Sequence, residues 1–168
     1  ARQKALWDVR KAGLNIMMSM KGDGKPVSFI EDCCVPLEHL ADYTQRLTAV
    51  FEKHGTRGTW YAHASVGTLH VRPILNMKGD GRIRMRRIAE EAADLVRRYK
   101  GAYSGEHGDG RMRAEFLPKM IGDANYRLCC DVKDTFDQAN IFNPGKIVRA
   151  PPMDTSLRYS PDWPTPEI

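Results

Sequence analysis

The chain lacks any apolar run long enough to cross a membrane, and it has few aromatic residues. Of its 168 residues, 42% are hydrophobic and 8% are aromatic. A membrane-spanning helix needs about 20 consecutive apolar residues, so we expect no membrane span. The first residues, ARQKALWDVRKAG, are polar and amphipathic, unlike a signal peptide. The hydrophobic fraction still suffices for one core, so we expect one domain or a large piece of one.

Several common catalytic and nucleotide-binding patterns are also missing. The chain has no GxxxxGK[ST] phosphate loop, no HExxH pair and no GxSxG nucleophile turn. A metalloprotease would therefore lack its usual helix-borne ligands. There is no strand-linked GxGxxG either, so the chain shows no dinucleotide site of its own.

Cysteine is scarce and is not spaced for metal binding. The four cysteines form two adjacent pairs, Cys33-Cys34 and Cys129-Cys130, without CxxC spacing. Free cysteines in apolar surroundings mostly behave as small buried side chains. We therefore expect reduced thiols and an intracellular, cytoplasmic protein.

The net charge is +5, and part of it comes from the basic run RIRMRRI at residues 82–88. Such a run could bind nucleic acid. Its apolar residues, however, recur at helical spacing, which puts most of the arginines on the solvated face of a helix. No aromatic residues are interleaved with them, so we predict no nucleic-acid partner. A mildly positive surface suits a small anionic substrate or an acidic partner domain.

Periodicity and turn residues predict an irregular alternation of helices and strands. We expect helices over residues 2–18, 36–54, 82–100, 112–121 and 124–138, and strands over 27–35, 59–65 and 68–75. This order is typical of an α+β domain with an antiparallel sheet and helices on one face. Proline becomes frequent near the end, so we expect a domain over 1–149 and a linker or arm over 150–168. Because the sequence does not start with Met, we expect an internal fragment of a longer chain or a chain trimmed at its start.

Two of the five histidines, His63 and His70, have spacing that could bring them to one metal ion. His63 and His70 flank a predicted strand–turn–strand, and a hairpin would bring their imidazoles within reach of each other. Glu106, in the segment GEHGDGR, would complete a set of two histidines and one carboxylate. Zn²⁺ accepts this set, and three protein ligands leave a position open for substrate. The alternative is that each histidine has a structural role.

The remaining candidates surround this set. His107 follows Glu106 directly, and because adjacent side chains usually diverge, it is free to act as a general base beside the metal. The alternative is a Gly-rich turn with a solvated acid and base. Arg10 and Arg72 are candidates for binding a substrate carboxylate. Arg72 faces the same side of its strand as His70. For each arginine, a solvated side chain is the alternative.

Three segments, YAHASVGTLHVRP, SGEHGDGRMRAEF and FDQANIFNPGKIV, occur in this order along the chain. Together they resemble the C-terminal domain of FAD-linked oxidases, a family that includes D-lactate dehydrogenases, the glycolate oxidase D subunit and D-2-hydroxyglutarate dehydrogenase. The likeness runs from about Trp7 to Val148. The stretch SFIEDCCVP and the proline-rich tail resemble the large members that are fused to a downstream iron–sulfur domain.

The resemblance implies a fold, a metal and a set of roles. The fold is a ferredoxin-like cap domain, and His63, His70 and Glu106 hold a divalent metal, which is zinc or else manganese or iron. His107 is the base that removes the hydroxyl proton, and Arg10 binds the substrate carboxylate. We therefore expect the substrate- and metal-binding part of an enzyme that oxidises a D-2-hydroxyacid to the 2-oxoacid by hydride transfer to FAD.

The resemblance also implies partners outside this chain. Asn143 and Lys146 are expected to lie toward the flavin, but most of the FAD is held by a separate N-terminal domain. An iron–sulfur cluster is expected in a further domain downstream. The isolated chain should therefore bind FAD poorly and be inactive. Arg72 stands where relatives often have asparagine, and the added cation would suit a dicarboxylate such as 2-hydroxyglutarate.

Two other functions stay open at this point. One is a metal-dependent hydrolase that uses the same three ligands and needs no flavin. The other is a non-catalytic binding module with a basic face. A homodimer is also left open, as is a peripheral location at the inner face of the membrane.

Overall fold

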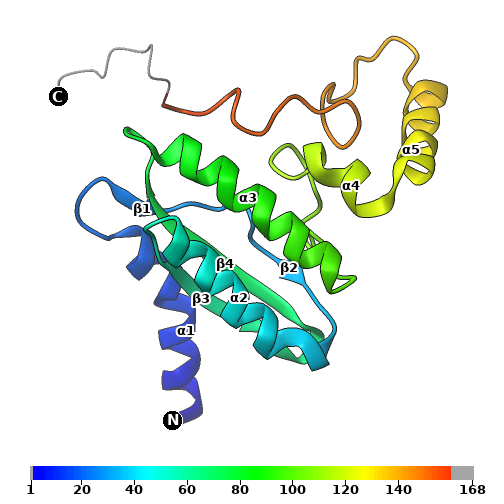
Figure 1. Ribbon diagram of the computed structural model, residues 1–168. Coiled ribbons are helices and arrows are strands. Elements are labelled where there is room, and N and C mark those ends of the chain that lie inside the picture. The colour runs from blue at the N-terminus through cyan, green and yellow to red at the C-terminus, as the bar shows by residue number, and fades with distance from the viewer. Residues whose placement is uncertain (1, 160–168) are drawn as a thin grey trace.

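The computed structural model describes residues 2–159 and contains a four-stranded antiparallel sheet (Figure 1). Its central strand is β4 (Thr68–Asn76). β3 (Gly58–His63) pairs with one edge of β4, and both β1 (Gly24–Pro26) and β2 (Cys33–Cys34) pair with the other. This architecture confirms the expected α+β class with an antiparallel sheet. The expected arm over 150–168 lies partly outside the described residues.

Alternation along β4 gives the sheet two different faces. Leu69, Val71 and Leu75 point to one face and join the hydrophobic core. His70 and Arg72 point to the opposite face, and both are nonetheless buried. The core and the histidines therefore lie on opposite sides of the same strand.

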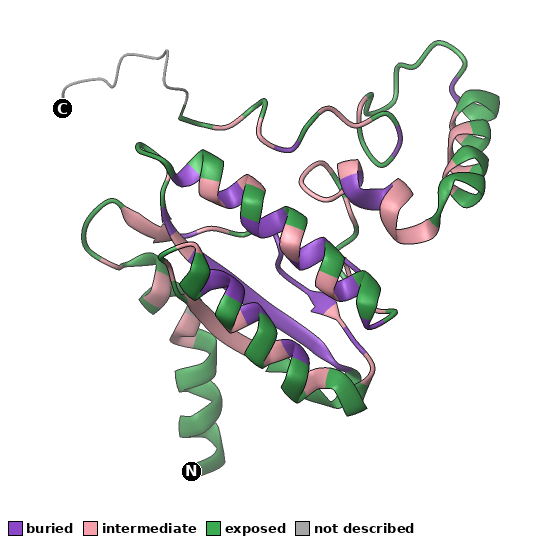
Figure 2. Cartoon of the chain, viewed as in Figure 1, coloured by how far each residue is buried: buried purple, intermediate pink, exposed green. Residues whose placement is uncertain are grey.

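Two helices cover the core face of the sheet, as expected from their apolar periodicity (Figure 1). They are α2 (Leu40–Lys53), which follows a 3-10 turn over Leu37–His39, and α3 (Gly81–Arg98). Figure 2 shows buried positions recurring along both helices. The buried positions recur every three or four residues, at Tyr43, Leu47, Val50 and Phe51 in α2 and at Met85, Ile88, Ala89, Ala92, Ala93 and Val96 in α3.

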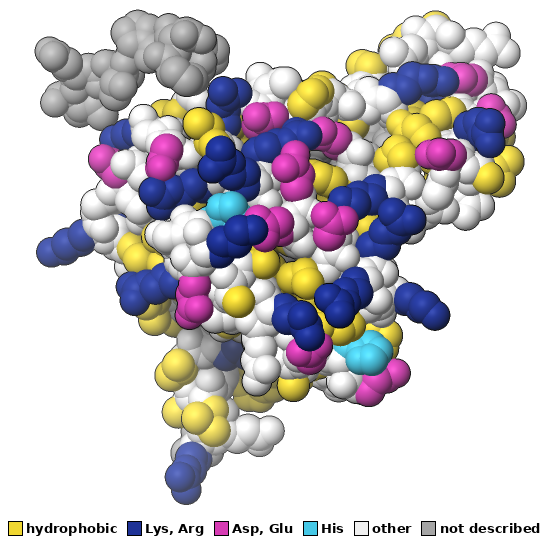
Figure 3. Space-filling view, viewed as in Figure 1, with side chains coloured by type: hydrophobic (Ala, Val, Ile, Leu, Met, Phe, Trp, Pro, Cys, Tyr) yellow, Lys and Arg dark blue, Asp and Glu magenta, His cyan; other side chains and the backbone are white. Residues whose placement is uncertain are grey.

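The basic run forms the first half of α3, and several of its arginines are paired with acids. Nε of Arg84 lies 2.8 Å from Oδ2 of Asp80, and Nε of Arg86 lies 2.8 Å from Oε1 of Glu90. Figure 3 shows basic and acidic side chains intermixed over this face. The surface is therefore of mixed charge rather than continuously basic.

The strand expected over residues 27–35 forms only at Cys33–Cys34, so that prediction was wrong for most of its length. Pro26 pairs with Ile74 and Cys33 pairs with Leu69, so the edge segment contains two more residues than the stretch of β4 that it faces. The extra residues bulge from the sheet. A regular strand would have sent Glu31 and Asp32 to opposite faces, whereas the bulge brings both carboxylates to the histidine side.

The link between β3 and β4 is a 3-10 turn over Ala64–Val66 that ends at Gly67. Gly67 has a φ of 71°, in the left-handed region. A Cβ at this position would overlap the carbonyl oxygen of Val35. Only glycine therefore fits both the turn and the close approach of the neighbouring segment.

The remaining helices lie outside the central layer. α1 (Arg2–Met18) precedes β1, while α4 (Leu117–Ile121) and α5 (Asp123–Phe136) follow the GEHGDGR loop after a 3-10 turn over Ala114–Phe116. Residues 137–159 contain no helix or strand, yet Val148 and Met153 are buried. Among residues 2–159, no helix is both long enough and apolar enough to cross a membrane.

Replacing Leu47 by alanine should lower the free energy of unfolding by about 2–5 kcal/mol, because it leaves a cavity between α2 and the sheet. Leu47 is fully buried, with 0% exposure. Urea denaturation followed by circular dichroism measures the change. Gln45→Ala, an exposed position on the same helix, serves as control and should change stability by no more than about 0.5 kcal/mol. Equal stability of the two variants would contradict the described packing of α2.

Candidate metal and substrate site

The β3–β4 hairpin brings His63 and His70 together on the open face of the sheet. Tyr61 pairs with His70 and His63 pairs with Thr68, so the two histidines are diagonal neighbours across the strands. Their ring centroids lie 4.9 Å apart with the rings nearly perpendicular, at 86°. The hairpin geometry expected from the sequence is confirmed.

Glu106 approaches this pair from a loop about forty residues downstream. Its Oε1 lies 2.7 Å from Nε2 of His70 and 3.6 Å from Nε2 of His63. One ligand atom from each of the three residues lies within 4.8 Å of the other two. The three residues expected to bind a metal are therefore brought together, and metal binding itself stays a prediction.

The environment of His70 fits a divalent cation. Its side chain is 2% exposed, and neither ring nitrogen has a hydrogen bond of good geometry although carboxylate oxygens are close. A buried polar nitrogen without a partner is costly, and a cation bound to Nε2 would supply one. Two imidazoles and a carboxylate are a donor set that zinc accepts. The side chains of His63 and Glu106 are 45% and 41% exposed, which leaves one side of the cluster open to a substrate.

A buried carboxylate, that of Asp32, holds the loop that carries Glu106. Its Oδ2 accepts hydrogen bonds from the backbone N–H of Glu106 at 2.9 Å and of His107 at 2.7 Å, and from the Ser104 hydroxyl at 2.9 Å. Its Oδ1 lies 2.5 Å from Nη1 of Arg113. Burial by itself would raise the pKa of Asp32, but these hydrogen bonds and the Arg113 charge outweigh burial, so the pKa lies below its usual value.

His107 lies beside the cluster rather than within it. Its ring centroid is 5.3 Å from that of His70, and its side chain is 50% exposed. Its Nδ1 lies 3.9 Å from Oδ2 of Asp32. Ligand atoms of Glu31, His70 and His107 form a second group within 4.8 Å, which shares His70 with the first. His107 thus lies next to the candidate metal ligands, and its role as a base stays a prediction.

The two arginines expected at the substrate differ in their surroundings. Arg72 is 7% exposed, its guanidinium pairs with Glu31, and its Nε donates a hydrogen bond to Oγ of Ser28 at 2.8 Å. Arg10 is exposed on α1, and its guanidinium lies 5.3 Å from the ring centroid of Tyr61. Both lie on the histidine side of the sheet, and their binding of substrate stays a prediction.

Asn143 and Lys146 lie in an exposed turn after α5. The end of this turn reaches the glycine-rich loop, since the backbone N–H of Ile147 donates to the carbonyl of Gly110 at 3.2 Å. Within residues 2–159, no hydrogen bond or ion pair links either side chain to the histidine cluster. Their role toward a flavin stays a prediction.

Sequence reasoning missed several residues that build the site: Tyr61, Glu31, Asp32 and Arg113. Tyr61 stacks on His70 with ring centroids 4.5 Å apart and an interplanar angle of 18°. The sequence could have indicated Tyr61, because residues two apart on a strand point to the same face, which places Tyr61 beside His63. Asp32 also had a signal, since an acid inside an apolar run must find partners when it is buried.

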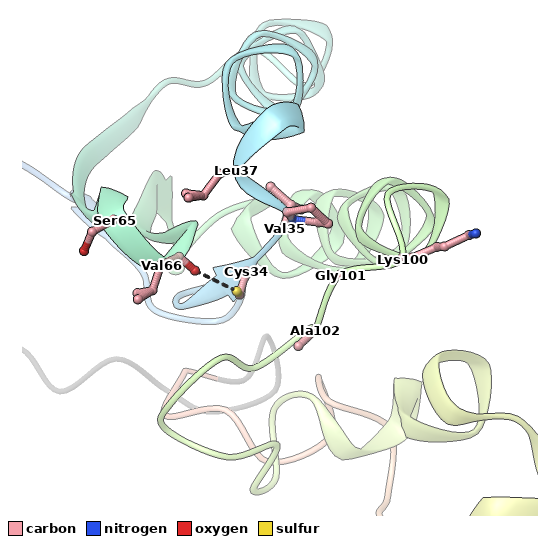
Figure 4. Close-up of a pocket in the computed structure, with 9 residues that line it drawn as sticks. Cys34, Val35, Leu37, Ser65, Val66, Lys100, Gly101 and Ala102 are labelled. Atoms are coloured by element: carbon pink, nitrogen blue, oxygen red, sulfur yellow. Dashed lines mark hydrogen bonds between the residues drawn. The ribbon is translucent and has the colours of Figure 1, made fainter.

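A shallow hollow of about 340 Å³ lies elsewhere, next to β2 (Figure 4). Val35, Leu37 and Val66 line it, and the Cys34 thiol donates to the Val66 carbonyl at 3.3 Å. None of the site residues lines this hollow. This hollow is therefore not part of the candidate metal and substrate site.

The fold and the cluster together define an α+β domain with a candidate divalent-metal site on the open face of its sheet. Comparison with known proteins supplies the family. Residues 1–147 match the family described as "FAD linked oxidases, C-terminal domain". The chain belongs to this family, as its three segments indicated.

Several relatives carry names that specify a 2-hydroxyacid. The chain is 37% identical to D-2-hydroxyglutarate dehydrogenase of Escherichia coli (strain K12) over 153 residues. This match covers 90% of this chain and 15% of that protein. It is 31% identical over 132 residues to D-lactate dehydrogenase of Archaeoglobus fulgidus, covering 79% of this chain and 29% of that protein. For glycolate oxidase subunit GlcD of Bacillus subtilis, the identity is 27% over 146 residues, with 85% and 30% covered. The chain thus spans only 15% to 30% of the length of these relatives.

Asp32→Asn should lower the free energy of unfolding by about 3 kcal/mol, because the amide group puts a donor against groups that all donate to the carboxylate. Urea denaturation measures this loss. Asp8→Asn removes one partner of an exposed ion pair with Lys4 on α1 and should cost less than about 1 kcal/mol. An Asp32→Asn protein as stable as the Asp8→Asn control would show that the carboxylate does not hold the loop.

Proposed function

We propose that this chain is the substrate- and metal-binding part of a flavin-dependent dehydrogenase that oxidises a D-2-hydroxyacid to the 2-oxoacid. The observation that carries the proposal is the meeting of His63, His70 and Glu106 in a member of the FAD-linked oxidase family. The names of the relatives support the substrate class, since 2-hydroxyglutarate, lactate and glycolate share a hydroxyl next to a carboxylate. D-2-hydroxyglutarate is the first substrate to test, because the relatives of that name are 34% to 38% identical.

His63, His70 and Glu106 hold the divalent metal, with zinc as first choice and manganese or iron as alternatives. A metal held there would lower the pKa of the substrate hydroxyl, and FAD bound by a separate domain would serve as the hydride acceptor. Buried His70 anchors the site inside the domain. The exposed sides of His63 and Glu106 leave room for the hydroxyacid.

His107 takes the proton from the substrate hydroxyl. An imidazole changes its charge near neutral pH, and it must lie within reach of the proton that it removes. The ring of His107 lies beside that of His70 and is half exposed, so it can face a substrate on the open side. The hydrogen bond from its backbone N–H to Asp32 fixes where the side chain begins.

Arg10 binds the substrate carboxylate from α1. A guanidinium forms paired hydrogen bonds with a carboxylate. Arg10 reaches the site over the ring of Tyr61, which is itself stacked on His70. The guanidinium of Arg72 is already paired with Glu31, which favours Arg10 over Arg72 for this role.

The proposed function requires a flavin-binding domain, and an apolar surface on α5 and the following turn supports its docking there. Figure 3 shows hydrophobic side chains gathered on α5. The exposed members of this surface are Leu128, Val132, Phe136, Ile141 and Phe142. Contiguous apolar surface commonly marks an interaction site. Asn143 and Lys146 lie in this turn, which supports their placement near the flavin.

Other expectations about the whole protein stay predictions. They are an iron–sulfur domain beyond residues 150–168, a homodimer, and a cytoplasmic protein that is free or held at the inner face of the membrane. We also propose that this chain by itself binds FAD poorly and does not turn over.

The metal site is tested by elemental analysis of the purified chain. The wild type should contain about one zinc, manganese or iron per chain, as expected for one three-ligand site. His70→Ala and Glu106→Ala should lose it, because each removes a ligand. His39→Ala, which alters an exposed histidine away from the site, should keep it. A folded wild type that takes up none of the three ions would contradict the metal site.

His107→Asn tests the proposed base in the flavin-containing protein that includes this chain. It should lower kcat for D-2-hydroxyglutarate, D-lactate or glycolate by about 10²- to 10⁴-fold, since the hydroxyl proton loses its acceptor. Dye reduction measures turnover, and the metal and FAD contents should be unchanged. His39→Asn is the control with normal turnover. Full activity of His107→Asn would remove it from the mechanism, and flavin-independent hydrolysis by the chain alone would favour a metal-dependent hydrolase.

A further inference from the structure

Glu31 is a buried acid that is neither one of the candidate metal ligands nor the proposed base. It lies in the bulge between β1 and β2 and is 8% exposed. Its Oε1 contacts the guanidinium of Arg72 on one side and lies 3.5 Å from Nδ1 of His70 on the other. Glu31 thus connects a buried cation to the most buried of the candidate ligands.

Arg72 and Ser28 hold Glu31 in place. Nη2 of Arg72 donates to Oε1 of Glu31, and Nε of Arg72 donates to Oγ of Ser28 at 2.8 Å. Burying a charge is costly unless it is paired and hydrogen-bonded, and this pair offsets the cost for both groups. Two of the guanidinium donors are thereby directed to the bulge, which gives Glu31 a fixed orientation.

The two nitrogens of His70 face different carboxylates. Nε2 lies 2.7 Å from Glu106, on the side of the cluster with His63, whereas Nδ1 lies on the side of Glu31. A histidine that binds a metal through one nitrogen commonly donates the other N–H to a carboxylate, which fixes both the tautomer and the ring orientation. We propose that Glu31, held by Arg72, is a positioning residue: its carboxylate accepts a hydrogen bond from the Nδ1–H of His70 and so directs the Nε2 lone pair at the metal.

Glu31 could instead be a ligand, since Glu31, His70 and His107 also form a compact group. The charge distribution argues against this. The oxygen of Glu31 nearest to His70 is the same Oε1 that pairs with Arg72. A divalent ion at that oxygen would face a guanidinium at close range in a buried site, where charge repulsion is strong. Glu31 therefore acts through His70 rather than on the metal.

This inference rests on the proposed metal site and gives Arg72 a role within the protein. The guanidinium supports Glu31, Glu31 orients His70, and His70 binds the ion. The positions of these residues agree with this order, because Arg72 and His70 are alternate residues on one face of β4. The bulge places the Glu31 carboxylate next to both of these side chains.

The experiment measures zinc affinity of this chain by competition with a chelating dye. Glu31→Gln should weaken zinc binding about 10- to 100-fold but keep a full site, because an orienting partner is weakened while all ligands remain. Arg72→Lys should also weaken it, and combining both changes should be no worse than Glu31→Gln alone, since both act through His70. Glu115→Gln is the matched control, because Glu115 is also paired with an arginine, Arg86, and should leave affinity unchanged.

The proton NMR spectrum of the zinc-loaded chain gives a second measurement. The Nδ1–H of His70 should produce a downfield resonance that is protected from solvent in the wild type. Glu31→Gln should shift it and Glu115→Gln should not. Circular dichroism of each variant establishes that it is folded, and Arg72→Lys carries the test if Glu31→Gln does not fold.

The outcomes separate this inference from the proposed function. Zinc binding that Glu31→Gln and Arg72→Lys leave unchanged would overturn the positioning role while the metal site stands. Complete loss of zinc in Glu31→Gln and in His107→Ala would make Glu31 a ligand and would also overturn it. A wild-type chain that binds no metal would overturn both the metal site and the positioning role.

Discussion

The buried carboxylate of Asp32 is the interaction on which the site depends. It receives two backbone N–H groups from the loop after Ser104, and a guanidinium from Arg113. Without these contacts, a glycine-rich loop would sample many conformations, because glycine has the largest backbone freedom. Because Glu106 and His107 belong to this loop, the same carboxylate determines where the candidate ligand and the candidate base lie relative to the sheet.

The two faces of the central strand β4 have different roles: one packs in the hydrophobic core, and the other carries residues of the candidate site. Leu69, Val71 and Leu75 pack against α2 and α3, while His70 and Arg72 face the bulge and the loop. The apolar face keeps the strand rigid, and a rigid strand holds a functional side chain more precisely than a loop does. Substitutions on the core face should therefore change stability, and those on the other face should change the candidate site.

Charges on the histidine face form a layered arrangement. Arg72 neutralises Glu31, Glu31 faces one nitrogen of His70, and Glu106 faces the other. Each buried charge has an opposite partner or a neighbouring imidazole, which is the condition for burying charge at tolerable cost. The open side, in contrast, is lined by half-exposed His63, Glu106 and His107, and this is where we propose that the hydroxyacid binds.

The sequence by itself determined the helices, the hairpin and the candidate ligands. Apolar spacing is a local signal, so α2 and α3 could be predicted, and a hairpin brings His63 near His70 by its geometry alone. Only the tertiary structure decided the rest. The bulge before β2 depends on pairing with β4, and the roles of Asp32 and Glu31 depend on partners more than forty residues away. A buried acid must find an opposite charge, but the chain order does not say which one, because that choice is made by packing between distant segments.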